Sequence, residues 1–165
     1  MRRARESDAG ALAAIERSAA ELFHALPNLA WIADEPVPST AAQQDVISRQ
    51  PVWVGEIDGR AVAFLIGELC PDALHIAEVS VHRDWHRHGI GRLMIQQAEV
   101  AAVRLGRREI TLTTFRAVAW NAPYYQRLGF KVETEPSARL ASLLASEIER
   151  GFVAGSRCAM RKALV

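Results

Sequence analysis

The stretch that could most directly bind a ligand covers residues 78–94, EVSVHRDWHRHGIGRLM, and it changes character midway. Valines alternate with polar residues at its start, which predicts a strand, and its end has the pattern of a helix. Between the two, Gly89 and Gly91 stand beside Arg87 and Arg92. Glycines let the unpaired N–H groups of a helix N-terminus approach a ligand, and arginine adds charge-assisted hydrogen bonds. The combination suits a phosphate or pyrophosphate.

The loop alone leaves two interpretations open. A tight turn that needs glycine for steric reasons, with exposed arginines beside it, would explain the same residues. Two phosphate-binding patterns are incomplete here, because Met94 stands where the dinucleotide fingerprint has its third glycine and no Gly-Lys-Ser/Thr follows. The missing glycine, together with an antiparallel hairpin predicted before the loop, weakens an NAD-dependent oxidoreductase as the function.

The histidines and cysteines do not indicate a metal site. The histidines near the loop, which are His75, His82, His86 and His88, lack HExxH spacing and a neighbouring Cys or Asp constellation. His86 and His88 are interpreted as exposed loop residues. Cys70 and Cys158 are far apart and form no CxxC pair, so we expect two reduced thiols near the core and no disulfide.

Length and composition predict one globular domain over residues 1–165. Hydrophobic residues make up 50% of the chain, charged residues 24%, and the net charge is +1. This balance does not favour nucleic acid as a partner, which would call for a strongly basic surface. No signal peptide is recognised and no apolar run reaches the length of a membrane span, so a cytoplasmic location without a membrane partner is expected.

Periodicity, capping residues and turn signals predict the elements that must position the loop. Strands are expected over residues 2–5, 52–57, 60–69, 74–82, 109–114, 130–134 and 157–164. Helices are expected after a cap at Ser7 or Asp8, from Ser39 or Thr40 to Gln50, and over residues 89–105, 121–129 and 137–151. This order predicts an α/β (α+β) fold, with a mixed, largely antiparallel central sheet of six to seven strands flanked by helices.

Two motifs in this order resemble the GCN5-related N-acetyltransferases, the GNAT family. The family's loop pattern, Gln/Arg-x-x-Gly-x-Gly/Ala, falls on residues 86–91, with His86 in the first position as a mild departure. The second pattern, Asn-x-x-aromatic-Tyr-x-x-x-Gly-Phe, falls on Asn121, Tyr124, Tyr125, Gly129 and Phe130. The resemblance extends from the first strand to Phe130.

The resemblance implies acetyl-CoA as co-substrate and a sheet in which residues 77–81 and 109–114 form a splayed pair of strands. The pantetheine arm would pair with the backbone of the first of these strands, as an added strand does. The pyrophosphate would lie on the glycine loop. The cofactor-binding residues implied in this way are Val79, Ser80, Val81, His86, Arg87, His88, Gly89, Ile90, Gly91, Arg92, Asn121 and Tyr124.

Acetyl transfer from a thioester needs a neutral amine, a polarised carbonyl and a proton for the leaving thiolate. Glu78 is the candidate base, unless it points away from the site as an ordinary strand residue. The resemblance implies Tyr125 as general acid and the Val81 N–H as the donor to the carbonyl oxygen. Tyr125 could instead be a core aromatic residue, as we expect Tyr124 to be. Asn121 could cap its helix as well as contact the pantetheine arm.

The expected function is therefore acetyl transfer to a primary amine of a small molecule or an exposed protein amine, by direct attack in a ternary complex. The alternative is a non-catalytic, sensory acyl-CoA-binding module of the same fold, but Glu78 and Tyr125 favour the enzyme. The acceptor site would involve residues 24–36 and the helical insertion 137–151. Asp34 and Glu35 could attract a cationic amine or belong to a solvated loop. A homodimer is left open.

Overall fold

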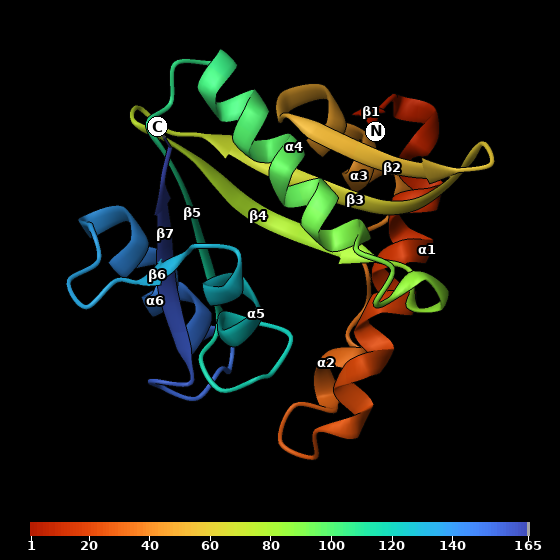
Figure 1. Ribbon diagram of the computed structural model, residues 1–165. Coiled ribbons are helices and arrows are strands. Elements are labelled where there is room, and N and C mark those ends of the chain that lie inside the picture. The colour runs from red at the N-terminus through yellow and green to blue at the C-terminus, as the bar shows by residue number, and fades with distance from the viewer. Residues whose placement is uncertain (165) are drawn as a thin grey trace. The chain divides into compact units, whose positions relative to one another are not determined.

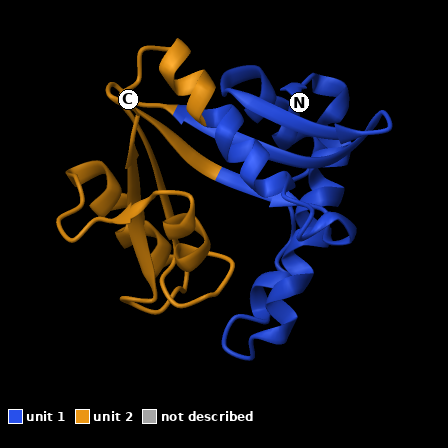
Figure 2. Cartoon of the chain, in the orientation of Figure 1, with its two compact units in different colours: residues 1–68, 78–98 blue, residues 69–77, 99–165 orange. Residues whose placement is uncertain are grey.

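The computed structural model describes residues 1–164, which form a seven-stranded mixed sheet accompanied by helices (Figure 1). The strand order is β1-β2-β3-β4-β5-β7-β6. The chain divides into two compact units, which are coloured in Figure 2. Unit 1 holds residues 1–68 and 78–98, and unit 2 holds residues 69–77 and the chain from residue 99 onward. The predicted fold class, a mixed and largely antiparallel sheet flanked by helices, is confirmed.

Unit 1 is built on a β-hairpin and the helices that precede it. Its elements are β1 (Arg2–Arg3), the 3-10 helix η1 (Glu6–Asp8), α1 (Ala9–Ala20), the 3-10 helix η2 (Glu21–Ala25), α2 (Trp31–Asp34), α3 (Thr40–Arg49), β2 (Val52–Ile57) and most of β3 (Arg60–Leu69). The unit also contains the end of β4 (Ala73–Val81), the 3-10 helix η3 (Arg83–Trp85) and the start of α4 (Ile90–Arg104).

The hairpin forms where the sequence predicts it. Asp58 and Gly59 both have positive φ angles, 49° and 75°, as the two-residue turns that match strand twist require. Alternation along the strands then buries one set of side chains against the helices. This core contains Leu12, Ile15, Val52, Val54 and Phe64, with Val46 and Ile47 of α3 packed against it. Burying each large side chain contributes about 1.5–3 kcal/mol.

A glycine in β2 lets the start of α4 lie close to the hairpin. A Cβ atom placed on Gly55 would lie 3.3 Å from Met94 Sδ and 3.8 Å from Ile90 Cγ2. A larger residue would therefore push the first turns of α4 away from the strand. The position of this turn fixes where the preceding glycine loop ends.

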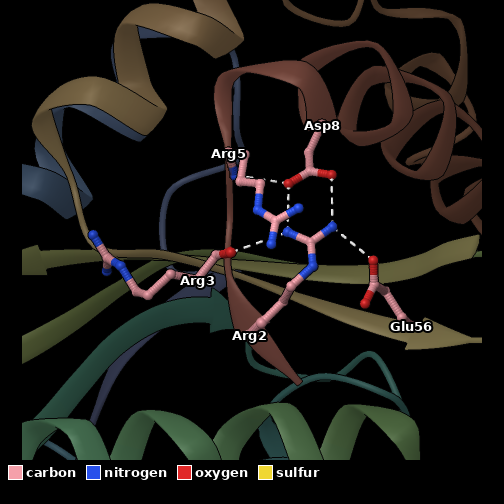
Figure 3. A network of polar contacts seen from close by, with 5 residues as sticks. All are labelled: Arg2, Arg3, Arg5, Asp8 and Glu56. Atoms are coloured by element: carbon pink, nitrogen blue, oxygen red, sulfur yellow. Dashed lines mark hydrogen bonds and ion pairs between the residues drawn. The ribbon is translucent and has the colours of Figure 1, made fainter. Parts of the chain in front are cut away.

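The N-terminal strand is held by an ion-pair network around Arg2 (Figure 3). Its guanidinium donates to Asp8 Oδ2 at 2.7 Å and Oδ1 at 2.9 Å, and to Glu56 Oε1 at 2.6 Å. Asp8 Oδ2 also accepts the backbone N–H of Arg5 at 2.7 Å. The hydrogen bond from Arg2 holds the pKa of Asp8 below its usual range. Asp8 stands at the N-cap position of α1, as predicted, but its side chain makes no capping hydrogen bond there, because Arg2 and the Arg5 N–H occupy the carboxylate.

The first helix is also shorter than its apolar pattern suggests. α1 ends at Ala20, and Leu22 and Phe23 belong to η2. Leu22 is 37% exposed and Phe23 is half-buried, so neither extends the buried face made by Leu12 and Ile15. In contrast, Ser39 caps α3 as predicted, accepting the N–H of Ala42 at 3.2 Å.

Unit 2 contains the start of β4, the end of α4, β5 (Glu109–Phe115), α5 (Ala122–Arg127), β6 (Lys131–Val132), α6 (Ala138–Glu149) and β7 (Arg157–Ala163). β5 runs parallel to β4, with Ala73–Ile76 paired to Glu109–Leu112. β7 lies antiparallel between β5 and β6. Cys158 is buried in β7 and Cys70 is half-buried, which is the expected placement of two reduced thiols.

The helical insertion predicted over residues 137–151 is α6, and polar side chains attach it to the strands. Arg139 Nη2 donates to Thr111 Oγ1 at 2.9 Å. Glu147, near the other end of the helix, accepts from Arg157 Nε at 2.7 Å and from Thr113 Oγ1 at 2.6 Å. Both side chains of the Glu147–Arg157 pair are less than a fifth exposed, so removing either one would leave a largely buried charge without its partner.

Candidate active site

The predicted glycine loop connects η3 to α4. Arg87 has φ 65° and Gly89 has φ 77°, so two of its residues adopt the left-handed conformation. A non-glycine residue with this backbone is uncommon and occurs often at functional sites. No atom lies within 4 Å of a Cβ placed on Gly89, so the space beside the loop is open. The side chains of Arg87 and Arg92 are exposed beside it.

The helix that follows supplies the electrostatic part of an anion site. α4 begins at Ile90, which is buried, and the N–H of Leu93 donates back to Gly89 O at 3.1 Å. The N–H groups in the first turn of a helix have no acceptor within it and carry partial positive charge. Together with two exposed guanidinium groups, these donors can bind a phosphate or pyrophosphate.

The histidines of the loop hold its shape. His86 Nε2 donates to the carbonyl oxygen of Val81 at 2.7 Å, and His88 Nδ1 donates to the carbonyl oxygen of His86 at 2.9 Å. The His88 ring also packs edge-on against Trp85, with 5.7 Å between centroids. His86 is half-buried, so the prediction that it is an exposed loop residue is wrong, because its ring folds back onto the end of β4. His88 is exposed as predicted.

Glu78 lies on β4 and has one described hydrogen bond to its own strand. Ser80 Oγ donates to Glu78 Oε1 at 2.6 Å, which places both side chains on the same face, as residues two apart on a strand must be. Ser80 is buried, and Glu78 is half-buried. Val79 and Val81 are also half-buried. Glu78 is therefore a partly desolvated carboxylate with an oriented oxygen.

Two polar residues of α1 and α3, Glu16 and Gln43, have no counterpart in the sequence predictions. Gln43 of α3 is 1% exposed, and its Nε2 donates to Glu16 Oε2 at 3.2 Å. Burial, together with the charge of Glu78, raises the pKa of Glu16 to about 7. A signal was present, because Glu16 follows Leu12 by four residues and so extends the buried stripe of α1.

The second motif lies in unit 2, on and before α5. Asn121 stands at the N-cap position of α5, as predicted, but its side chain makes no capping hydrogen bond. The Asn121 Oδ1 atom is buried and has no hydrogen-bond partner within residues 1–164. A buried amide oxygen without a donor is costly and calls for an explanation, such as a bound ligand.

The burial of the two tyrosines of the motif is the reverse of what we expected, because Tyr125 is the more buried of the two. Tyr125 is 7% exposed, and its ring packs edge-on against Tyr124 and Phe130, at 5.5 and 5.6 Å between centroids. Tyr124 is half-buried, with the Arg127 guanidinium 5.8 Å from its ring centroid. Tyr125 is therefore the core aromatic residue by packing. A role as general acid would depend on its hydroxyl group and not on its ring.

Among residues 1–164, no group of three or more His, Cys, Asp or Glu residues is arranged to hold a metal ion. Likewise, none of the helices between residues 1 and 164 combines the length and apolar character needed to cross a bilayer.

Comparison with known proteins identifies the family. Residues 48–132, just over half of the 165, match the acetyltransferase (GNAT) domain. The chain therefore belongs to the GNAT acetyltransferase family, which confirms the resemblance carried by its two motifs.

Solved structures show the same fold at low sequence identity. The PaiA N-acetyltransferase from Thermoplasma acidophilum, in complex with coenzyme A, is 18% identical with a TM-score of 0.73, and the match covers 98% of this chain and 96% of that one. The ribosomal-protein-S18-alanine N-acetyltransferase from Escherichia coli is 18% identical with a TM-score of 0.69, covering 99% and 92%. A GNAT-family acetyltransferase from Streptococcus pneumoniae is 16% identical with a TM-score of 0.71, covering 99% and 98%.

Proposed function

We propose that this protein is an acetyl-CoA-dependent N-acetyltransferase. It would transfer the acetyl group to a primary amine of a small molecule or an exposed protein amine, by direct attack in a ternary complex. The observation that carries the proposal is the loop before α4, where Arg87 and Gly89 adopt left-handed backbone beside open space. This geometry in a GNAT fold supports a site for the pyrophosphate of coenzyme A.

The remaining cofactor contacts follow from the chain's own donors and acceptors. The side chains of Arg87 and Arg92 supply positive charge, and the N–H groups of Gly89, Ile90 and Gly91 supply backbone donors. The pantetheine arm runs beside Val79, Ser80 and Val81 and contacts Asn121, whose buried amide oxygen would accept one of its N–H groups. Tyr124 borders this arm. His86 and His88 contribute by shaping the loop through their side-chain hydrogen bonds.

The first chemical step makes the acceptor nucleophilic. An amine with a pKa of about 10 arrives as an ammonium ion at pH 7. Glu78 takes one of its protons, and the freed lone pair on nitrogen attacks the carbonyl carbon of the thioester. The backbone N–H of Val81 donates to the carbonyl oxygen as negative charge develops there.

The second step releases the thiol. The C–S bond breaks as the carbonyl re-forms, and Tyr125 gives its hydroxyl proton to the leaving thiolate. The nitrogen then loses its remaining surplus proton to solvent, and the Tyr125 oxygen takes up a proton from solvent. Glu78 returns its proton to solvent, so each turnover yields one amide, one thiol and one released proton.

Ligand-dependent melting tests cofactor binding. Acetyl-CoA at about 100 times its Kd should stabilise the fold by about 2.7 kcal/mol, and NAD at the same concentration should not. A melting temperature that acetyl-CoA leaves unchanged, or that NAD raises more, would contradict the proposal. Binding of acetyl-CoA without turnover on any amine would favour the non-catalytic acyl-CoA-binding module.

A further inference from the structure

The short helix η3 joins β4 to the glycine loop, and hydrogen bonds within the segment close it into a turn. The N–H of Trp85 donates to His82 O at 2.9 Å, and the N–H of His86 donates to Arg83 O at 3.1 Å. The N–H of Asp84 donates to His82 Nδ1 at 3.3 Å. Because these bonds are local, they shape the turn but do not fix its position. That position depends on bonds to other elements of unit 1.

Two backbone N–H groups attach the turn to other elements of unit 1. The N–H of His82 donates to Val62 O on β3 at 2.8 Å, and the N–H of Arg83 donates to Ser18 Oγ on α1 at 3.1 Å. Arg83 is the first residue of η3, and the first N–H of a helix has no acceptor within that helix. Ser18, 65 residues away in sequence, therefore supplies an acceptor that η3 itself lacks.

Ser18 is not the residue that α1 alone would favour at its position. It is 7% exposed and follows Leu12 and Ile15 on the buried side of the helix. Alanine has the higher helix propensity, and a buried hydroxyl is costly unless it is hydrogen-bonded. The hydrogen bond from Arg83 compensates for that cost. The hydroxyl at this position is thus explained by η3 and not by α1.

The side chain of Arg83 makes a second, weaker link to the same end of α1. It forms an ion pair with Glu21, the residue directly after the helix. The Arg83 and Glu21 side chains are 59% and 43% exposed, so solvent screens this pair and it stabilises little. The backbone hydrogen bond to buried Ser18 is therefore the contact that fixes η3 to α1.

The position of η3 is passed on to the glycine loop through His86. This residue follows η3, and its ring Nε2 donates to Val81 O at 2.7 Å. His88 then donates to His86 O at 2.9 Å, across Arg87 with its left-handed φ of 65°. A displacement of η3 would therefore displace the first residues of the loop as well.

We propose that Ser18 is a positioning residue for acetyl-CoA, whose hydroxyl holds η3 and the start of the glycine loop in the conformation that the pyrophosphate requires. The proposal rests on the proposed function, which assigns the pyrophosphate to this loop. Without the hydroxyl, the Arg83 N–H turns toward water and η3 shifts with it. Binding of acetyl-CoA then has to restore the loop and leave that N–H without an acceptor, so the cost is paid on binding.

Amide hydrogen exchange tests the hold on η3 without any ligand. Ser18→Ala removes the acceptor with a substitution that suits a buried helix position. In ¹⁵N-labelled protein, the Arg83 amide should exchange about 5-fold faster in Ser18→Ala than in the wild type, as expected for the loss of one hydrogen bond. The amides in the middle of α1 should exchange at their wild-type rates. A wild-type exchange rate at Arg83 in Ser18→Ala would overturn the proposal.

Calorimetric titration with acetyl-CoA tests the positioning role. Ser18→Ala should raise the Kd about 5-fold. With a working amine, the KM for acetyl-CoA should rise by a similar factor while kcat is retained. A merely structural role would lower the melting temperature, and with it the amount of folded protein, but would leave Kd and KM unchanged.

Two control variants separate this contact from its surroundings. Ser48→Ala makes the same substitution in α3, where the hydroxyl donates to Asp45 O, and its Kd should match the wild type. Glu21→Gln removes the ion pair with Arg83 but keeps the backbone hydrogen bond, and its Kd should stay within about twofold of the wild type.

The outcomes separate this proposal from the proposed function. A wild type that binds acetyl-CoA, together with an unchanged Kd in Ser18→Ala, would overturn the role of Ser18 alone. A Kd that Glu21→Gln raises as much as Ser18→Ala does would also overturn it, because the side chain of Arg83 and not its N–H would then be responsible. A wild type that does not bind acetyl-CoA would contradict the proposed function itself.

Discussion

His75 and Thr111 are register partners on the parallel strands β4 and β5, and His75 Nδ1 lies 3.0 Å from the Thr111 hydroxyl. Arg139 Nη2 donates to the same hydroxyl at 2.9 Å and lies 3.5 Å from Nδ1. With its own oxygen occupied as acceptor, the hydroxyl donates to Nδ1, and the ring nitrogen acts as an acceptor. The imidazole is therefore neutral, with its proton on Nε2.

This arrangement predicts that His75 makes the fold sensitive to acid. Burial, and then the charge of Arg139, lower its pKa to about 4 from the ordinary 6.5. Between these two pKa values the unfolded chain binds a proton at His75 that the folded chain does not bind. The free energy of unfolding therefore falls as pH falls from 6.5 to 4. His75→Gln keeps an acceptor but cannot be protonated in this range. Urea unfolding at pH 4.5 should show the wild type losing about 1–3 kcal/mol more than the variant, relative to pH 7.5. Equal losses in the two proteins would refute this account of His75.

Glu16 predicts a stability change of the opposite sign. Its folded pKa is raised to about 7 from 4.5, so the wild type is destabilised as pH rises through this interval. Glu16→Gln should therefore melt at a higher temperature than the wild type at pH 8, and at nearly the same temperature at pH 4.5. Thermal melts at the two pH values test this, and a variant that is less stable at pH 8 would show that the ionised carboxylate stabilises the fold.

Gly89→Val should weaken acetyl-CoA binding. Gly89 has φ 77°, which a β-branched residue adopts at a cost of about 1–2 kcal/mol, and the added side chain would fill the open space beside the loop. Gly106→Val is the matched control, because Gly106 has φ 68° and similarly open surroundings after α4. Calorimetric titration should show reduced affinity in the first variant alone. Equal acetyl-CoA affinities in the two variants would show that the loop is not part of the cofactor site. We expect Gly91→Val to weaken binding as well.

Tyr125→Phe should lower kcat far more than it raises KM. The buried ring keeps its packing against Tyr124 and Phe130, so the melting temperature should change little. A general acid contributes about 10²–10⁴-fold to the rate, which is the expected loss. Tyr124→Phe is the internal control and should be nearly neutral. Full kcat in Tyr125→Phe across the pH range would mean that the thiolate takes its proton from another source, and damage confined to Tyr124→Phe would place the motif one residue out of register.

The parts of the fold that depend on neighbouring residues were predictable from the sequence. The Asp58–Gly59 turn, the Ser39 cap and the loop ending at Ile90 are each determined within a few positions. The motif around Asn121 located α5 as well, although not that the Asn121 side chain makes no capping hydrogen bond, because an amide that caps and one that does not look the same in sequence.

Contacts between distant residues were not predictable in this way. Asp8 is a good capping residue by type, but Arg2 and the Arg5 N–H compete for its carboxylate. Glu16 and Gln43 are 27 residues apart, and although Glu16 extends the buried stripe of α1, that stripe does not indicate which residue of α3 meets it. The packing of α1 against α3 brings them into contact. Burial and like charge then change the protonation of Glu16, which no local pattern records.

The activity proposed for this protein is transfer of the acetyl group of acetyl-CoA to an amine. The most direct measurement follows release of the coenzyme A thiol from acetyl-CoA across a panel of small primary amines and peptides with free amino groups, with mass spectrometry of each acceptor. We predict that at least one amine accelerates thiol release above the amine-free rate and gains one acetyl group in equal amount. Thiol release that no amine accelerates, or that occurs without acetylated product, would contradict the claim.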